Sequence, residues 1–206
     1  PLSRSTLWTA LQDKSASVRQ TVCNILGEAG DRAAVSQLVG LLTDSSLSVQ
    51  REAATALGRI GDPGAIMFLM DQLSRDLPRE LEHAILYALI EIGDASPLLR
   101  GLESKHPREV ARSLIVLDQL RPKAFNANDL TRFLSTTDET LRKTLIRVAI
   151  RRPEWAPAVC AVFDRWIDER QVTDERLPII TGIAPNYLDQ IAGQKLVARL
   201  LNWHEP

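Results

Sequence analysis

A fifteen-residue pattern that ends in Gly-Asp recurs three times along this chain of 206 residues. The copies are "SVRQTVCNILGEAGD" (17–31), "SVQREAATALGRIGD" (48–62) and "ELEHAILYALIEIGD" (80–94), so Gly-Asp returns after 31 and then 32 residues. Weaker copies, "EVARSLIVLDQLRP" and "TLRKTLIRVAIRRP", follow at 109–122 and 140–153. Each copy places apolar residues at helical spacing. A generic helical bundle does not require the same two residues at a fixed interval, so the spacing predicts stacked helical repeats.

A second amphipathic segment lies between successive copies and gives each unit two helices. It reads "RAAVSQLVGLLTD" at 32–44, "GAIMFLMDQLSRD" at 64–76 and "ASPLLRGLESKHP" at 95–107. Glycine adopts the left-handed helix end at low cost and aspartate is a favourable N-cap, so each Gly-Asp should end one helix and begin the next. These residues are Gly30, Gly61 and Gly93, followed by Asp31, Asp62 and Asp94. Gly27 and Gly58, inside the second helices, are predicted to pack helix against helix.

The strand-like alternation of apolar and polar residues is missing from the sequence, which therefore predicts an all-α solenoid. The repeat rhythm runs over residues 1–152 and loosens afterwards. Residues 153–206 are predicted to form a divergent helical cap of the same solenoid, because terminal repeats deviate from the others. Trp155, Trp166 and Trp203 fall in this segment, and we expect them in its core.

Composition narrows the classes of function. The chain has 25 Lys and Arg against 26 Asp and Glu, so its overall charge gives no sign of nucleic-acid binding. No run of eighteen apolar residues is present, and we expect no membrane insertion. The chain begins at Pro1 without a signal peptide, which we interpret as a fragment of a longer protein whose compartment is unknown. Cys23 and Cys160 form no short-spaced pair, which excludes a zinc knuckle, a CxxC and a CxxCH motif and favours buried free thiols.

The motif "SVRQTVCNILGEAGD", with its Val-Arg opening and its Leu-Gly-x-x-Gly-Asp close, resembles the bacterial HEAT repeats of the phycobilisome-lyase-like type. The resemblance covers residues 1 to about 152. It implies a right-handed α-solenoid of about five to six HEAT repeats. It carries little information about function, because the same fold serves many roles.

A narrower resemblance concerns "LEHAILYALIEIGD", "LRGLESKHPREVARSLIVLDQL" and "LRKTLIRVAIRRPEWA". These stretches are similar to the HEAT segment of large secreted bacterial proteins. In that family the segment lies between a sugar-dehydrogenase-like β-propeller and a C-terminal c-type haem module. The resemblance implies an extracytoplasmic connector within a multidomain redox protein, without the parts that perform the redox chemistry.

Some enzymes are built on this fold, and two kinds have residue patterns that can be compared with this sequence. Iron-dependent hydroxylases of the fold resemble repeats with paired His-Glu dipeptides, but here His204-Glu205 stands alone and Glu82-His83 is reversed. We therefore expect no metal site and no cofactor. DNA-alkylbase glycosylases resemble a basic channel with aromatic residues and a carboxylate. Weak counterparts of these residues are present in this chain, namely Trp155, Arg151, Arg152 and Asp118. A DNA-alkylbase glycosylase is therefore the alternative function.

The remaining candidate is a surface formed by the second helices, which in a HEAT solenoid line the concave side. Positions one turn apart, aligned by the Val-Arg openings, vary from unit to unit and include costly residue types. The candidate binding residues are Arg51, His83, Tyr87, Arg112, Lys143, Arg147 and Arg151. The aligned positions form a row of polar side chains along the second helices. His83 is interpreted as one member of this row rather than as a metal ligand or a catalytic residue. Arg112 is expected to join Lys143 and the arginines after it in an exposed basic patch; an ordinary solvated face remains the alternative.

These observations favour a non-catalytic HEAT-repeat scaffold or connector. Its expected partner is a protein, a peptide or a neighbouring domain of the same chain. Nucleic acid is not expected as a partner, because the net charge is close to zero.

Overall fold

The computed structural model describes residues 3–120 and 125–202. In these ranges thirteen α-helices and five short 3-10 helices follow one another, and no strand is present. None of the described helices is long and apolar enough to cross a membrane. The chain divides into two compact units, Pro1–Arg121 and Pro122–Pro206. The predicted all-α class is confirmed, whereas the boundary at residue 152, which was drawn from the repeat rhythm, stays a prediction.

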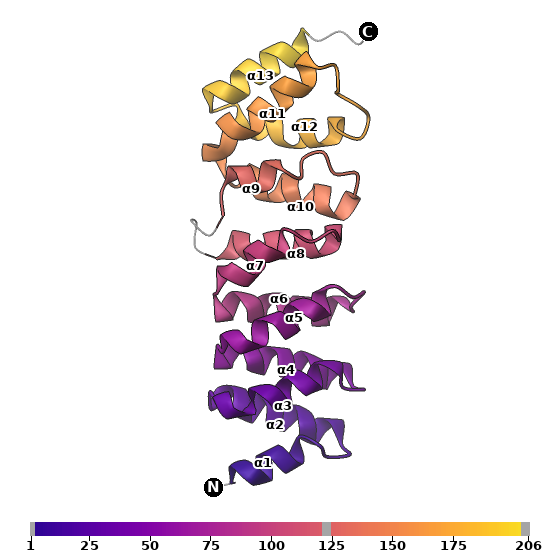
Figure 1. Cartoon of the computed structure of the whole chain (residues 1–206), viewed down its shortest axis with the longest axis vertical. Coiled ribbons are helices and arrows are strands. Elements are labelled where there is room, and N and C mark those ends of the chain that lie inside the picture. Colours follow the sequence, from indigo (N-terminus) through magenta and orange to yellow (C-terminus); the bar gives the residue numbers. More distant parts are fainter. Residues whose placement is uncertain (1–2, 121–124, 203–206) are drawn as a thin grey trace. The chain divides into compact units, whose positions relative to one another are not determined.

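The first unit contains four successive helix pairs (Figure 1). The second helices α2, α4, α6 and α8 contact their neighbours in that order, and the first helices lie against this layer. The pairs are α1 (Arg4–Ala10) with α2 (Ala16–Glu28), α3 (Val35–Gly40) with α4 (Leu47–Ile60), α5 (Ile66–Leu73) with α6 (Arg79–Ile92), and α7 (Ala95–Gly101) with α8 (Pro107–Gln119). The 3-10 helices of this unit are η1 (Arg32–Ala34), η2 (Leu41–Thr43) and η3 (Pro63–Ala65).

Glycine allows neighbouring second helices to approach at backbone distance. A Cβ atom on Gly27 would lie 2.8 Å from the Cα of Ala56 on the next second helix, and one on Gly58 would lie 2.8 Å from the Cα of Ala88. Ala56 and Ala88 are fully buried at these contacts. Any larger side chain at either glycine would push the helices apart, as the sequence predicted for helix-packing positions.

The Gly-Asp pairs end and begin helices as predicted. Gly30, Gly61 and Gly93 have φ angles of 61°, 67° and 76°, which is the left-handed region. The carboxylate of the following aspartate accepts a hydrogen bond from the backbone N–H two residues later. These bonds are Ala33 to Asp31 (3.2 Å), Gly64 to Asp62 (2.8 Å) and Ser96 to Asp94 (2.9 Å).

Gly61→Val is expected to lower the free energy of unfolding by about 1–3 kcal/mol, because a β-branched residue is strained at positive φ. Gly40 is the matched control, since its φ is −58° and no atom lies within 4 Å of an added Cβ. Gly40→Val should change the same free energy by less than about 0.5 kcal/mol. Urea denaturation of both variants measures the difference. Equal losses would show that Gly61 does not need its left-handed conformation.

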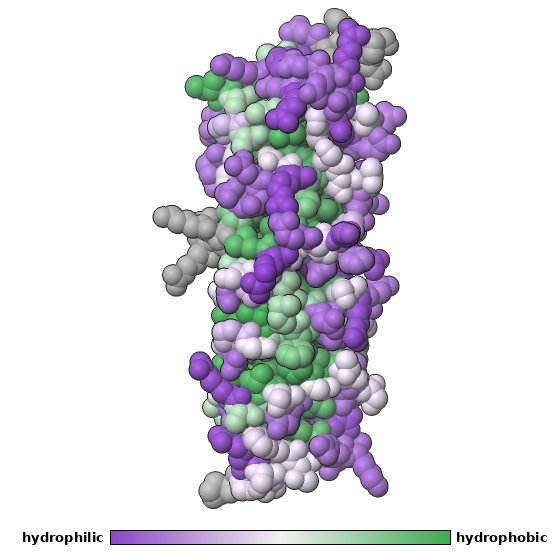
Figure 2. Space-filling view, in the orientation of Figure 1, coloured by the Kyte–Doolittle hydropathy of each residue, from purple (hydrophilic) through white to green (hydrophobic). Residues whose placement is uncertain are grey.

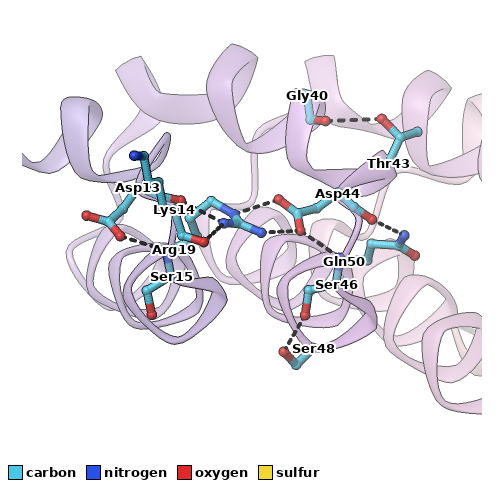
Figure 3. A network of polar contacts seen from close by, with 10 residues as sticks. All are labelled: Asp13, Lys14, Ser15, Arg19, Gly40, Thr43, Asp44, Ser46, Ser48 and Gln50. Carbon is cyan, nitrogen blue, oxygen red and sulfur yellow. Dashed lines mark hydrogen bonds and ion pairs between the residues drawn. The ribbon is translucent and has the colours of Figure 1, made fainter.

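An ion pair that the sequence analysis missed ties the first repeat to the second (Figure 3). Arg19, from the Val-Arg opening of α2, donates from Nε and Nη2 to the two carboxylate oxygens of Asp44, at 2.8 and 2.7 Å. Its Nη1 donates to the carbonyl of Asp13 at 2.7 Å, and Asp44 also accepts from the N–H of Ser46 at 2.8 Å. The hydrogen bond from Arg19 holds the pKa of the Asp44 carboxyl below its ordinary value. The pair therefore stabilises the fold at neutral pH, and this contribution is lost as the pH falls through the lowered pKa.

The second unit begins with another helix pair and continues with a differently spaced group of helices. Its elements are α9 (Ala127–Thr131), α10 (Glu139–Ile150), η4 (Pro153–Trp155), α11 (Ala156–Asp168), α12 (Leu177–Ile183), η5 (Ala184–Tyr187) and α13 (Ile191–Leu201). Trp155 and Trp166 are buried as predicted, whereas Trp203 lies outside the described residues. Tyr187 is fully buried and donates its hydroxyl hydrogen to the carbonyl of Ala149 at 2.9 Å. This bond satisfies a phenol that would otherwise be costly to bury.

Candidate interaction surfaces

Polar side chains at equivalent positions of the second helices meet where α2, α4 and α6 pack side by side. Arg59 Nη1 lies 3.0 Å from Glu28 Oε1, which joins equivalent positions of α2 and α4. Asn24 Nδ2 donates to Glu52 Oε1 at 3.1 Å between the same helices. A Cβ atom on Gly58 would lie 2.6 Å from Glu91 Oε2, so Glu91 of α6 stands against α4 at the same level. The three helices are therefore in the register that the sequence alignment assumed.

Arg51, His83 and Tyr87 are exposed on α4 and α6. The Tyr87 side chain is conspicuous, because 53% of its surface faces solvent. His83 lies one helical turn before it. In the ranges that the structure describes, no group of three His, Cys, Asp or Glu side chains is placed to hold a metal ion. We call the surface formed by Arg51, Thr55, His83 and Tyr87 the α4–α6 face.

The prediction that Arg112 belongs to an exposed basic patch is wrong. Arg112 is buried, with only 7% of its surface exposed. Its Nε donates to Glu82 Oε1 at 2.9 Å. Its Nη1 donates to the carbonyls of Leu73 and Arg75, the latter at 3.1 Å. The physical reason lies in α5, whose C-terminal end contacts α8 and covers the guanidinium. The alignment equated Arg112 with exposed positions of other repeats, but it could not show this cover.

The other basic candidates lie on α10 and at its C-cap, Arg151, in the second unit. Lys143, Arg147 and Arg151 are exposed and follow one another at intervals of four residues, so they share one side of the helix. Lys143 Nζ forms an exposed ion pair with Glu139 Oε1 at 2.6 Å. The stripe is a feature of the second unit by itself and gains no contribution from the buried Arg112.

Three of the residues that suggested a glycosylase are buried or packed against other side chains. Trp155 is 8% exposed and packs edge-on against Phe125, with 5.2 Å between ring centroids. The Arg152 guanidinium carbon lies 5.0 Å from the centre of the Trp155 ring. Asp118 is buried in the first unit with 8% of its surface exposed. The His204-Glu205 dipeptide, considered as an iron ligand pair, lies outside the described residues.

Both cysteines are buried free thiols, as the sequence predicted. Burial, with a smaller effect of Glu52, raises the pKa of Cys23 to about 12. Burial also raises the pKa of Cys160 to about 11, with a smaller effect of Asp164. Both side chains therefore remain protonated at neutral pH and lack the thiolate that nucleophilic or redox chemistry needs.

A groove that the sequence analysis missed lies in the second unit. Its volume is about 510 Å³, and two arginines and three hydroxyl groups contribute to its walls. The lining residues are Ser135, Thr137, Arg170, Gln171, Thr173, Glu175 and Arg176. No sequence signal marked the groove: α11 ends like the helices before the Gly-Asp pairs, with Arg170 in the glycine position, but this equivalence appears only in the backbone conformation.

Repeated helix pairs, left-handed glycine ends and glycine-mediated stacking form one consistent unit in the first part of the chain. Residues 5–90 match the family model for HEAT repeats. The HEAT match runs from within α1 to within α6 and so spans nearly all of the first three helix pairs. The predicted all-α class and the presence of HEAT repeats in the first part of the chain are confirmed. No curated protein matches the chain.

Solved structures show likenesses at low sequence identity. The complex of CpcE and CpcF of phycocyanin lyase from Nostoc sp. PCC7120 is 20% identical, with a TM-score of 0.44, over 88% of this chain and 81% of that chain. An engineered protein is 18% identical, with a TM-score of 0.44, over 89% and 95%. Human deoxyhypusine hydroxylase is 21% identical, with a TM-score of 0.36, over 97% and 83%.

Proposed function

We propose that this chain is a non-catalytic HEAT-repeat scaffold or connector, whose α4–α6 face binds a segment of another protein or of a neighbouring domain. The observation that carries the proposal is the exposed pair His83 and Tyr87 on α6 beside Arg51 on α4. These side chains project from helices whose packing is fixed by the contact of Gly58 with Ala88. A rigid helix face holds contact residues more precisely than a loop does.

The residue types favour binding over simple solvation. Tyrosine and arginine are enriched at protein interfaces, because they combine apolar area with polar groups. A tyrosine that is 53% exposed can still bury much of its ring against a partner. Lysine and glutamate would keep the face soluble without offering such a contact. The expected ligand is therefore a peptide segment with an apolar side chain for Tyr87 and an acidic group for Arg51.

The finer proposal is that the chain is a connector inside an extracytoplasmic multidomain redox protein. It rests on the resemblance of residues 81–156 to the HEAT segment of such proteins. In that arrangement the α4–α6 face would contact an adjoining domain. The glycosylase alternative receives no support from a buried Trp155 that already packs against Phe125.

Peptide-display selection on the immobilised protein tests the proposal, followed by affinity measurements with the selected peptides. Tyr87→Ala should weaken their binding by about tenfold or more, as expected for an aromatic anchor. Phe68→Ala is the matched control: Phe68 is 52% exposed, but it belongs to α5. Figure 2 shows apolar side chains gathered around α5 on the viewed face. Both variants should melt like the parent protein.

Two results would contradict the proposal: the first would move binding from the α4–α6 face to α5, and the second would replace the scaffold role. One is a selection whose peptides bind Tyr87→Ala as tightly as the parent but lose affinity for Phe68→Ala. The other is release of free base from alkylated DNA by the purified protein, which would establish the glycosylase instead.

A further inference from the structure

The end of α11 has an arginine where three other helices have glycine. Arg170 has a φ angle of 52°, and it is the only residue other than glycine with positive φ in residues 3–120 and 125–202. The N–H of Gln171 donates to the carbonyl of Trp166 at 2.7 Å, in the same pattern that joins Asp31 to Leu26 at the end of α2. Gly30 and Arg170 therefore occupy the same position of the same helix-ending motif. Arginine is the more strained residue there.

The attraction of a cation to the negative end of a helix does not require this position. Glu169, one residue earlier, has an ordinary negative φ of −84° and lies equally close to the end of α11. A basic residue there would meet the helix dipole without left-handed strain. A strained side chain that lines a groove is instead a typical mark of a functional position.

Arg176, which also lines this groove, is held in place by its neighbours. Its guanidinium carbon lies 4.6 Å from the centre of the Trp166 ring, and Trp166 is itself buried. Its Nη1 donates to the carbonyl and to the side-chain oxygen of Gln171, at 3.0 and 2.9 Å. These contacts orient the planar fork, and among residues 3–120 and 125–202 they leave its Nε and Nη2 hydrogens without an acceptor. An arginine that is fixed in advance loses less side-chain freedom when it binds an anion.

We propose that this groove of the second unit binds a phosphate group, carried by a small molecule or by a phosphorylated side chain, through Arg170 and Arg176. Ser135 and Thr137 add hydroxyl donors on the walls, whereas the hydroxyl of Thr173 donates to Glu175. Two guanidinium groups and two hydroxyls offer more donors than the two oxygens of a carboxylate can use, whereas a phosphate monoester presents three charged or partly charged oxygens. The site is independent of the α4–α6 face and of the scaffold role.

Glu175 sets the strength of the site. Its hydrogen bond with Thr173 is the main cause that holds the pKa of this carboxyl below its ordinary value, so it is ionised at neutral pH. Its negative charge opposes one of the two arginines, and the groove carries a modest net positive charge. Removal of this charge should therefore tighten binding, which is opposite to the effect of removing Arg170.

NMR titration of the whole chain with inorganic phosphate, against sodium chloride at equal ionic strength, tests the proposal. Saturable shifts are expected at residues of the groove. Arg170→Gly should lose about fivefold or more in phosphate affinity while its melting temperature rises, because glycine relieves the strain. Glu175→Gln should bind phosphate several-fold more tightly. Arg165→Gln, which removes an exposed arginine of α11 outside the groove, should titrate like the parent.

A second arm compares a peptide that contains phosphoserine with its unphosphorylated form. Tighter binding of the phosphopeptide than of inorganic phosphate identifies a modified protein as the source of the group, and the reverse order identifies a small molecule. The proposal is overturned if phosphate shifts the groove residues no more than chloride does. It is also overturned if Arg170→Gly binds phosphate like the parent, or if Arg165→Gln loses as much affinity as Arg170→Gly.

Discussion

Gly58→Val is expected to lower the free energy of unfolding by about 3 kcal/mol, because it overfills the contact between two second helices. The first added carbon alone would lie 2.8 Å from the Cα of Ala88 and 2.6 Å from Glu91 Oε2. The glutamate can move, but the backbone of α6 cannot move without separating the two repeats. The loss comes from steric overlap and not from backbone strain, since Gly58 lies inside the helix.

Urea denaturation of the purified variant measures this loss, with Gly40→Val again as the control. Gly40 also belongs to a helix, but an added Cβ there meets no atom within 4 Å. The two variants thus make the same chemical change with and without a neighbour. If Gly58→Val unfolds at the same urea concentration as Gly40→Val, the close approach of α4 and α6 is wrong.

Arg112→Met is expected to lower the free energy of unfolding by about 3–5 kcal/mol, the usual range when one partner of a buried pair is removed. Methionine fills much of the same volume, so the loss is mainly electrostatic. It leaves Glu82 without its cation and the carbonyls of Leu73 and Arg75 without their donor. The side chain of Glu82 is 30% exposed, and water can compensate it in part, which favours the lower end of the range.

Lys143→Met is the matched control, because it also removes one cation from an ion pair with a glutamate. Lys143 and Glu139 are 69% and 66% exposed, so their pair should contribute less than about 0.5 kcal/mol. Thermal and urea melts of the two variants distinguish a structural Arg112 from an exposed one. Similar losses in both would restore Arg112 to the solvent-facing patch that the sequence predicted.

The sequence predicted those features that depend on a residue and its immediate neighbours along the chain. Gly61 and Asp62 form a helix end and a cap because of backbone preferences that hold in any helical protein. The burial of Arg112 depends instead on the end of α5, about 39 residues away in sequence, and no periodicity reports such a cover. The ion pair of Arg19 with Asp44 could be predicted only in part. Aspartates at positions 13, 44 and 76 repeat at the same 31- and 32-residue intervals, but the interval does not reveal the partner.

The phosphate groove was invisible to sequence reasoning for a different reason. An arginine at positive φ leaves no composition signal, because arginine is common on every helix surface. Only its equivalence with Gly30, seen once the hydrogen bond from Gln171 to Trp166 is known, makes it unusual. Ser135 and Thr137 complete the groove from a loop more than thirty residues earlier, and their meeting with Arg170 depends on tertiary packing.

The glycine and alanine contacts make the junction of α2 with α4 interchangeable with that of α4 with α6. Each junction uses the same two residue types at the same level of the helices, Gly27 with Ala56 and Gly58 with Ala88. A gene segment that encodes one such helix pair could therefore be duplicated in frame without requiring a new kind of contact. The duplicated pair would meet a neighbour of the correct shape on both sides. The repeat array can therefore grow by whole helix pairs. Point substitutions at the exposed positions of each added second helix then alter what that repeat binds.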